Sequence, residues 1–395
     1  MKIKKIIFIN RTDSGSTGTI VTSLFNNASN FGFSSYLIAS KIYNPGERKI
    51  EIDTNKFLQF CNKILTKISG KDGFLNFYNT KKIIKNFKKI KPDIVNLHNA
   101  LGYFINYPML LKYLHKSGIK TYITCHDCWW FTGKCPHFEY VGCSKWKTEC
   151  YKCPQNKMYP KALIFDRTRK MFSIKKKLFT NKKFTFIFPS QWLLNYAKES
   201  FLKNEKMVRI NNGIILGNYM KHSCDKNESS KVKLIFIANP WTKRKGIDTI
   251  RFLANNLPED QFELFVVGII SEEYKISKNN VHYCGLMKRE EIIKLFTNKT
   301  IFVNPTLEDN FPTVDIESLA AGVPVISFDT GGTKEILGEF GVIVEKGSDI
   351  KMLEAIVHYQ FDEMASEKMR ERSLLFEETK MINKYYQTFT ESLDK

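Results

Sequence analysis

The sequence predicts an α/β protein built from two doubly wound parallel sheets, and three observations support this fold class. Short runs rich in β-branched residues alternate with amphipathic stretches, as in consecutive βαβ units. The length of 395 residues fits two domains better than one. A polar, non-periodic segment near residues 221–230 separates two series of such units. We therefore expect an N-terminal domain over 1–220, a linker over 221–232, a C-terminal domain over 233–375 and a terminal helix over 376–395.

The predicted strands are short apolar runs bounded by polar or turn-forming residues. In the N-terminal domain they are Lys5–Ile9, Ser35–Ala39, Ile94–His98, Thr121–Cys125 and Phe184–Phe188. A long irregular, cysteine-rich loop over 126–165 follows the fourth of them. In the C-terminal domain the predicted strands are Lys233–Ala238, Phe262–Val267, Val281–Cys284, Ile301–Asn304, Val323–Ser327 and Val342–Val344. Helices are expected between them near 246–256, 289–298 and 315–321.

The composition indicates a globular protein that is neither exported nor membrane-spanning. The sequence contains no run of eighteen apolar residues, and its first ten residues lack the apolar length and cleavage site of a signal peptide. Nine cysteines, an odd number, favour reduced thiols over a disulfide framework. We therefore expect a cytoplasmic location.

The charge is distributed unevenly along the chain. Residues 1–230 hold 40 Lys and Arg against 14 Asp and Glu, whereas the remainder holds 21 against 26. The basic runs 81–89 and 175–177 have apolar neighbours, a pattern suited to an anionic lipid surface or to polyphosphate. A solvated helix face is an equally good interpretation of either run alone. The asymmetry between the halves is the better evidence for an anionic partner of the first domain.

The most informative segment is 304–326, which is typical of a strand, a turn, a helix, a glycine turn and a second strand. Its acidic turn falls at the carboxyl end of a parallel strand, where open α/β sheets bind ligands. Backbone N–H groups at the start of the helix would favour a diphosphate. Carboxylates accept hydrogen bonds from sugar hydroxyls. The combination therefore predicts a nucleotide-sugar site.

This segment resembles the retaining glycosyltransferases of family four, whose signature is an acidic residue, seven residues, a glutamate, and then Ala-x-Ala-x-Gly-x-Pro-Val. Asp309 and Glu317 stand at that spacing. The resemblance implies that Asp309 approaches the transferred sugar and that Glu317 holds the ribose hydroxyls. Glu308, one place earlier, could take the role of Asp309. A capped helix with incidental acids is the structural alternative.

Further donor-binding residues are expected around this turn and at two other sites. They are Asn310, Phe311, Pro312 and Thr313 of the acidic turn, Arg244 and Lys245 of a basic turn, and Gly15 and Gly18 of a glycine-rich turn. The two cations would neutralise the departing nucleoside diphosphate, and the glycines would let the backbone approach the ligand. An exposed basic turn is the alternative for the cations. The glycine-rich turn lacks the features of a P-loop or a nicotinamide site.

The segment that begins at His126 resembles the family-four subgroup related to colanic-acid glycosyltransferases. His126 ends a predicted strand, and the resemblance implies a catalytic histidine that contacts the transferred sugar. Four cysteines of the following loop include a Cys-x-x-Cys pair: Cys135, Cys143, Cys150 and Cys153. A structural zinc, buried thiols and a disulfide pair all remain open for them.

Taken over nearly the whole chain, the resemblance implies a GT-B hexosyltransferase with two Rossmann-like domains that face each other across a cleft. It implies retention of configuration, with a UDP- or GDP-linked sugar as co-substrate. No Asp-x-Asp motif occurs, and we expect no catalytic metal. With the basic first domain, it implies a saccharide acceptor linked to polyprenyl diphosphate at the inner membrane surface, in exopolysaccharide, O-antigen or lipopolysaccharide synthesis.

Two other functions remain as alternatives. One is a nucleotide-sugar epimerase of the same architecture, which would convert the donor without any acceptor. The other is a nucleic-acid-binding protein, suggested by the net charge of +21. The sequence lacks base-stacking and groove-reading motifs, so we expect no nucleic acid partner.

Overall fold

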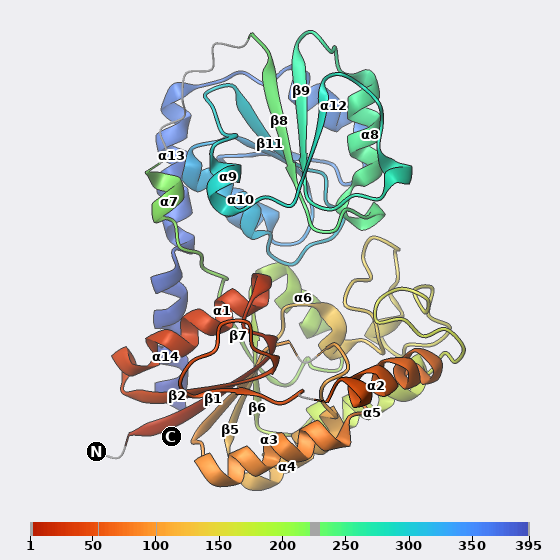
Figure 1. Ribbon diagram of the computed structural model, residues 1–395, viewed down its shortest axis with the longest axis vertical. Coiled ribbons are helices and arrows are strands. Elements are labelled where there is room, and N and C mark those ends of the chain that lie inside the picture. The colour runs from red at the N-terminus through yellow and green to blue at the C-terminus, as the bar shows by residue number, and fades with distance from the viewer. Residues whose placement is uncertain (1–2, 54, 100, 222–229, 394–395) are drawn as a thin grey trace. The chain divides into compact units, whose positions relative to one another are not determined.

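The computed structural model describes residues 3–53, 55–99, 101–221 and 230–393, and its strands form two separate parallel sheets (Figure 1). The first compact unit comprises the chain up to Asn211 together with the chain from Met381 onward. The second unit is Asn212–Lys380. The predicted α/β class with two doubly wound sheets is confirmed.

The first sheet has seven strands in the order β3-β2-β1-β4-β5-β6-β7. All of its pairings are parallel. The order reverses between β1 and β4, which makes the carboxyl ends of these two strands the switch point at which doubly wound sheets bind ligands. The strands are β1 (Lys4–Thr12), β2 (Phe33–Lys41), β3 (Lys49–Glu51), β4 (Ile94–Leu97), β5 (Lys120–Thr124), β6 (Phe184–Phe188) and β7 (Lys206–Arg209).

Helices cover both faces of this sheet. Successive residues of β1 point to opposite faces, so this strand contributes side chains to two cores. Ile7 and Ile9 lie in a core shared with α3 and α4, whereas Ile6 and Phe8 lie in a core shared with α1 and α14. The helices of the first unit are α1 (Gly15–Asn27), α2 (Lys56–Ser69), α3 (Phe77–Ile90), α4 (Tyr107–Ser117), α5 (Thr168–Phe179), α6 (Gln191–Glu199) and the C-terminal α14 (Glu378–Leu393). Its 3-10 turns are η1 (Ala28–Phe31), η2 (Cys128–Phe131) and η3 (Lys145–Lys147).

The C-terminal helix α14 packs on the first sheet through its aromatic residues. The Tyr385 hydroxyl lies 3.2 Å from Thr124 Oγ1, and the Tyr386 hydroxyl donates to the Leu24 carbonyl at 2.6 Å. Both tyrosines and Phe389 are buried. The amphipathic pattern of this helix alone does not indicate which of the two domains it covers.

The second sheet has six strands in the order β10-β9-β8-β11-β12-β13, with parallel pairings and a switch point between β8 and β11. Its strands are β8 (Val232–Ile237), β9 (Phe262–Val267), β10 (Val281–Gly285), β11 (Thr300–Asn304), β12 (Val325–Phe328) and β13 (Val342–Val344). Its helices are α7 (Gly217–Met220), α8 (Ile247–Asn256), α9 (Arg289–Ile293), α10 (Thr313–Ala321), α11 (Thr333–Leu337), α12 (Asp349–Val357) and α13 (Glu363–Ser373). Its 3-10 turns are η4 (Lys243–Lys245), η5 (Glu272–Tyr274) and η6 (Leu374–Phe376).

Several predicted boundaries differ from the structure. The division between the units falls after Asn211, ahead of the predicted linker 221–232, of which 222–229 lie outside the described residues. The strand predicted from Val323 begins at Val325, because Gly322 takes a left-handed backbone conformation that ends α10. The helix predicted over 289–298 ends at Ile293.

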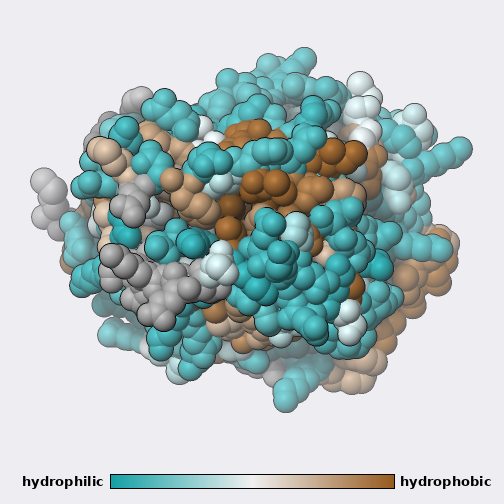
Figure 2. Space-filling view, turned by 90° about the horizontal axis from the view of Figure 1, so that it is seen from above, coloured by the Kyte–Doolittle hydropathy of each residue, from teal (hydrophilic) through white to brown (hydrophobic). Residues whose placement is uncertain are grey.

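None of the helices in the described ranges has both the length and the apolar character needed to cross a bilayer. In the view from above in Figure 2, most of the surface is hydrophilic, and hydrophobic residues gather near the middle.

Candidate functional site

The acidic segment of the second unit folds as its sequence predicts. It runs from β11 through a turn into α10, then through Gly322 into β12. The acidic turn therefore lies at the carboxyl end of β11, beside the switch point between β8 and β11. This placement puts the start of α10 and the turn residues at the ligand-binding edge of the sheet.

The basic turn and the acidic turn, more than sixty residues apart in sequence, meet at this edge. Lys245 Nζ lies 2.5 Å from Asp309 Oδ2. The Arg244 guanidinium donates to the Glu308 carbonyl, and the Leu307 amide donates to the Arg244 carbonyl at 2.8 Å. A cation that could meet a phosphate is thus held beside a carboxylate that could meet a sugar hydroxyl.

The residues of the acidic turn are not equally accessible. Glu308 is fully buried, whereas the Asp309 side chain is about one quarter exposed. Asn310 and Phe311 are also buried, and Phe311 packs edge-on against Phe376 in the core. Pro312 and Thr313 begin α10. Asp309 is therefore the acid of this turn that a substrate can reach, and the Phe311 side chain serves the core.

Glu317 lies on α10 with its side chain almost wholly buried. Its Oε1 is 3.6 Å from Arg289 Nη2, at the start of α9, and the Tyr219 hydroxyl lies beside it. Burial raises the pKa of Glu317, and Arg289 opposes that shift. Arg289 and Tyr219 could not be selected from the sequence, because they come from the separate helices α9 and α7.

Asp315, two residues earlier on α10, is a further buried acid. Asn304 Nδ2 donates to its Oδ1 at 2.8 Å, which ties the end of β11 to α10. Burial raises the pKa of Asp315 to about 7. The sequence analysis assigned this residue no role, although it lies within the acidic motif.

Two glycines allow neighbouring loops to pack against the acidic turn. Gly246 has φ of +82°, and a Cβ there would lie 2.1 Å from the Pro305 carbonyl oxygen. Gly331 has φ of +55°, and a Cβ there would lie 1.5 Å from the Asp309 carbonyl oxygen. Any side chain at Gly331 would displace the turn that carries Asp309. Gly331 is therefore a site residue that the sequence analysis missed.

The glycine-rich turn of the first unit leads from β1 into α1. A Cβ on the buried Gly18 would lie 2.8 Å from the Asp13 carbonyl carbon, so this glycine lets α1 pack against the end of β1. Gly15 begins α1 with φ of +75° and open space around it. The geometry gives Gly18 a packing role, and the donor-binding role of both glycines stays a prediction.

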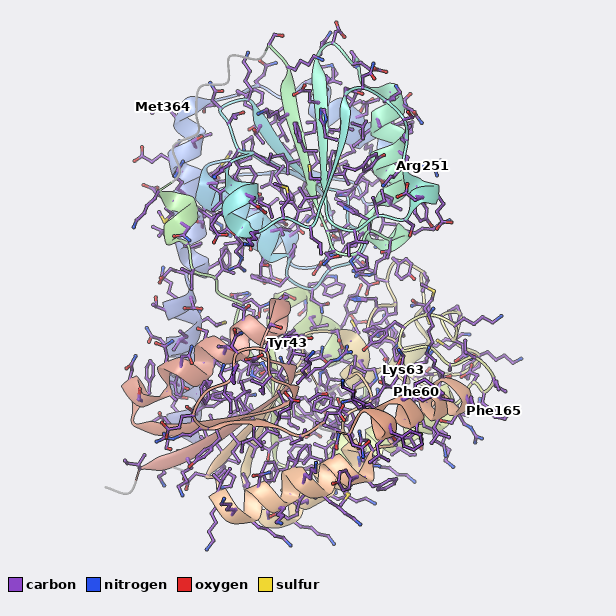
Figure 3. The ribbon with its side chains drawn as sticks, viewed as in Figure 1. Tyr43, Phe60, Lys63, Phe165, Arg251 and Met364 are labelled. Carbon is purple, nitrogen blue, oxygen red and sulfur yellow. The ribbon has the colours of Figure 1, made fainter. Side chains whose placement is uncertain are left out.

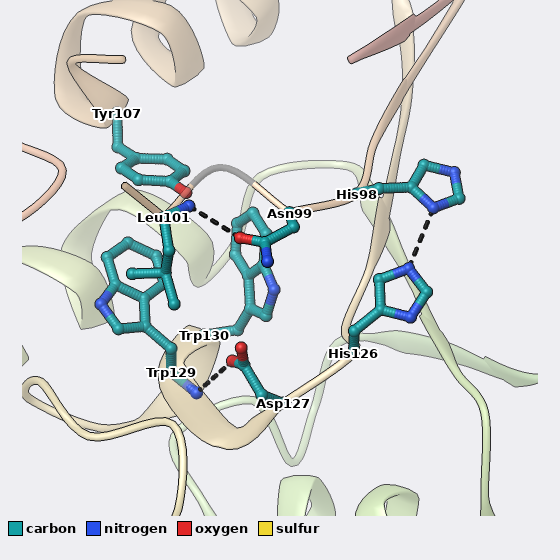
Figure 4. Close-up of a pocket in the computed structure, with 8 residues that line it drawn as sticks. All are labelled: His98, Asn99, Leu101, Tyr107, His126, Asp127, Trp129 and Trp130. Atoms are coloured by element: carbon teal, nitrogen blue, oxygen red, sulfur yellow. Dashed lines mark hydrogen bonds between the residues drawn. The ribbon is translucent and has the colours of Figure 1, made fainter. Parts of the chain in front are cut away.

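His126 follows β5 and belongs to a chain of hydrogen bonds (Figure 4). Its Nε2 lies 3.0 Å from His98 Nδ1, and His98 Nε2 lies 2.7 Å from Asn96 Oδ1. The Asn96 amide nitrogen donates to Thr124 Oγ1, so its oxygen must accept from His98. This assigns the proton between the rings to His126 Nε2 and leaves His126 Nδ1 as an acceptor.

Burial keeps both histidines neutral near pH 7. It lowers the pKa of His126 to about 4 and that of His98 well below its usual value, with His126 as a second cause for His98. Asp127, the next residue, accepts from the Trp129 amide at 2.9 Å, and burial raises its pKa to about 6. The pocket around these groups is completed by Asn99, Leu101, Tyr107, Trp129 and Trp130.

A second buried acid, Asp72, lies close to this pocket. Among the described residues, neither of its carboxylate oxygens has a hydrogen-bond partner, and neither does the Tyr107 hydroxyl. Burial raises the pKa of Asp72 to about 7, against the attraction of Lys175 and Arg11. Sequence reasoning missed this residue because nothing local distinguishes it.

The basic run 175–177 is interpreted from the sequence as a surface feature, and for Lys175 this interpretation is wrong. Its side chain is buried, and its Nζ donates to the Trp129 and Thr132 carbonyls at 2.6 and 3.1 Å. The same Nζ lies 3.2 Å from the centre of the Trp129 ring. Burial lowers its pKa to about 7. The helical period places this lysine on the inner face of α5, where it fixes the loop after β5.

The four cysteines of the long loop do line one pocket, together with Lys134 and Trp146. All of them are free thiols, and Cys153 is hydrogen-bonded to Cys135. Within the described ranges, no three His, Cys, Asp or Glu side chains are placed to hold a metal ion. The thiols are partly or fully buried, and a structural zinc or a disulfide at these cysteines stays a prediction.

Residues 221–373 match the protein family "Glycosyl transferases group 1". The chain is 24% identical over 310 residues to a protein of Escherichia coli (strain K12) described as a candidate colanic acid biosynthesis glycosyl transferase, WcaC. That alignment covers 73% of this chain and 72% of the relative.

Solved structures share the fold over nearly the full chain. Sucrose-phosphate synthase from Thermosynechococcus elongatus superposes with a TM-score of 0.70 at 15% identity, over 99% of both chains. Anabaena Alr3699/HepE, solved in complex with UDP, superposes with a TM-score of 0.63 at 14% identity, over 98% of this chain and 100% of the other. At these identities the likeness concerns the fold alone, which is GT-B.

Proposed function

We propose that the chain, a glycosyltransferase whose residues 221–373 match the family "Glycosyl transferases group 1", moves a hexosyl group from a UDP-sugar to a lipid-linked saccharide. The resemblance of its motifs favours retention of configuration. The relative of colanic acid biosynthesis favours bacterial surface polysaccharide as the product. The family match also favours transfer over the epimerase and nucleic-acid alternatives.

The observation that carries the donor site is the contact between Lys245 and Asp309 at the carboxyl edge of the second sheet. The negative charge of a diphosphate there would be neutralised by Lys245 and Arg244. The backbone N–H groups at the start of α10 would donate hydrogen bonds to it. Asp309 would accept hydrogen bonds from the transferred sugar. Glu317 would accept hydrogen bonds from the ribose hydroxyls, and Arg289 would favour the ionised form of its carboxylate.

UDP is preferred to GDP because a neighbour of the same fold was solved with UDP. His126 would accept a hydrogen bond from the transferred sugar through Nδ1, and its neutral state suits an acceptor. The acceptor hydroxyl would attack the anomeric carbon while the C–O bond to the diphosphate breaks. Its proton would pass to the departing phosphate oxygen, on the same face as the attack. A product of inverted configuration would refute this step.

Calorimetric titration tests the donor site directly. Wild-type protein, Glu317→Gln and the exposed-site control Glu354→Gln would be titrated with UDP, GDP and their common sugar conjugates at fixed salt. We expect saturable UDP binding that the control retains and Glu317→Gln weakens by about tenfold or more, the usual scale of a lost charged hydrogen bond. Absence of any nucleotide binding to the wild type would overturn the proposal.

A further inference from the structure

Helix α2 of the first unit carries its apolar stripe on the outside. Five large apolar side chains recur at helical spacing and are 39% to 73% exposed: Phe57, Phe60, Ile64, Leu65 and Ile68. The buried residue of this helix is Thr66. Amphipathic helices of globular proteins normally turn such a stripe toward the core. On α2 the stripe faces solvent, and the described residues of the first unit leave it uncovered.

A second exposed apolar segment continues this surface. The Leu163 amide donates to the Lys67 carbonyl at 2.7 Å, which fastens the segment to the last turn of α2. Gly70 ends α2, and a Cβ on it would lie 2.7 Å from the Phe165 carbonyl oxygen. Because glycine has no side chain, the segment can pack closely against the end of α2. Figure 3 shows Phe60 and Lys63 along α2 and Phe165 near its far end.

Together these side chains form what we call the α2 patch. Its members are large apolar groups that are at least 39% exposed: Phe57, Phe60, Ile64, Leu65, Ile68, Leu163, Ile164 and Phe165. An exposed apolar patch of this size on a soluble domain marks an interaction surface.

The charges around the patch indicate which partner it fits. α2 contains Lys56, Lys63 and Lys67 and no acidic residue. Lysines on the flank of an apolar stripe bury their methylene stems while their ammonium groups meet anionic lipid headgroups. Two copies of this face would bring like charges together, which disfavours self-association.

The basic run 81–89 on α3 lacks such a stripe. Its apolar residues Ile83 and Phe87 are buried in the core, so its lysines form a solvated face. This contrast identifies α2, and not α3, as the element suited to a bilayer.

The same helix also forms a wall of a pocket in the first unit. This pocket, of about 620 Å³, lies at the carboxyl ends of β1, β2 and β3. Lys56, Gln59, Phe60 and Lys63 of α2 line it, and Arg11 and Lys41 face it from the strands. Two carboxylates, Glu51 and Asp53, also line it, so four cations stand against two acids, and the net positive charge suits a diphosphate. Phe60 belongs to both the pocket and the patch, so a lipid seated on the patch would have its headgroup at the pocket.

We propose that the α2 patch docks the first unit on an anionic bilayer and presents the pocket behind it to the diphosphate of a lipid-linked acceptor. The acceptor part of this inference rests on the proposed function. The docking part stands on α2 and the segment 163–165 alone.

Flotation with lipid vesicles tests the docking. The variant Phe57→Ser/Leu65→Ser/Ile68→Ser removes apolar side chains that lie outside the pocket and are already exposed, so its fold should persist. The control Ile350→Ser/Met364→Ser removes exposed apolar side chains from the second unit. Vesicles of phosphatidylglycerol would be compared with vesicles of phosphatidylcholine, at low salt and at half-molar salt.

We expect the wild type and the control to float with phosphatidylglycerol, and the triple variant to partition at least about tenfold less. Phosphatidylcholine or high salt should weaken binding of the wild type. Equal flotation of the triple variant, or no flotation of the wild type, would overturn the docking. The docking would also be overturned if light scattering showed a dimer of the wild type that does not bind vesicles and that the triple variant does not form.

UDP titration of the same variants separates the two proposals. The triple variant should bind UDP as the wild type does, because its substitutions lie in the first unit, whereas Glu317 and Lys245 belong to the second. Loss of vesicle binding with UDP binding intact supports the docking. Failure of the wild type to bind UDP would refute the proposed function and leave the vesicle result to stand by itself.

Discussion

Replacing Asp72 by asparagine is expected to stabilise the first unit at alkaline pH and to leave its stability nearly unchanged at acid pH. The Asp72 carboxylate is buried, and among the described residues neither oxygen has a hydrogen-bond partner. Burial raises its pKa from 3.8 to about 7. When folding raises the pKa of a group, its contribution to the free energy of unfolding is fully present below the pKa of the unfolded state. That contribution is lost as the pH rises through the pKa of the folded state.

The magnitude follows from the shift of about three pKa units. At 1.36 kcal/mol per unit, ionised Asp72 costs about 4 kcal/mol above pH 7 and nothing below pH 4. Asparagine has nearly the same shape and cannot ionise. The gain is partly offset, because the charge of Asp72 favours the buried Lys175 ammonium. We therefore expect a net gain of about 2 to 4 kcal/mol in the free energy of unfolding at pH 8.

Urea unfolding at pH 4, 6.5 and 8 measures this gain through tryptophan fluorescence. Four of the five tryptophans lie in the first unit: Trp129, Trp130, Trp146 and Trp192. The control is Glu47→Gln, whose carboxylate is 86% exposed, and we expect it to change stability by less than about 0.5 kcal/mol. Equal stability of Asp72→Asn and wild type at pH 8, or a gain of the same size at pH 4, would refute the reasoning.

Three further predictions concern the candidate site. Lys245→Ala should weaken UDP binding by about tenfold to a hundredfold in calorimetry, with partial rescue by Lys245→Arg; unchanged affinity would remove Lys245 from the diphosphate site. Gly331→Ala should destabilise the second unit by about 2 to 4 kcal/mol in thermal unfolding, whereas Gly217→Ala, where a Cβ meets open space, should not; similar melting of both variants would contradict the packing argument. His98→Ala should lower kcat by about tenfold to a hundredfold, because the ring of His126 loses its orienting partner. The affinity for UDP should stay the same. A parallel loss of UDP binding would indicate a merely structural role for His98.

The sequence predicted the sheets and the acidic motif because both depend on local patterns. Alternation of apolar runs with amphipathic stretches identifies strands such as β6 and β9 to the residue. Asp309 lies in the turn after β11 and Glu317 lies on α10, the helix that follows, so local structure sets their spacing. The two edge strands of the first sheet, β3 and β7, escape this reasoning. β3 has three residues and none of them is buried, since it lies at the end of the sheet and has one neighbour.

Contacts between distant segments could not be predicted from periodicity. His98 and His126 meet because β4 and β5 are neighbours in the sheet, and Arg289 reaches Glu317 from another helix. The direction of an amphipathic stripe is equally hidden. The spacing of Phe57, Phe60 and the residues after them predicts a helix, but the same spacing fits a stripe that faces the core.

The buried acids and the pocket beside α2, all in the first unit, indicate which ligand group meets which residue. Asp72 and Asp127 have raised pKa values, so an anion beside them would raise these values further and destabilise the complex. Hydroxyl donors would instead satisfy their oxygens and favour ionisation. The pocket that includes Arg11 and Lys63 holds four cations against the two carboxylates of Glu51 and Asp53, and its net positive charge suits a diphosphate. A saccharide joined to a lipid diphosphate is a single ligand that presents hydroxyls to the acids and an anion to the cations, which is the combination that the first unit provides.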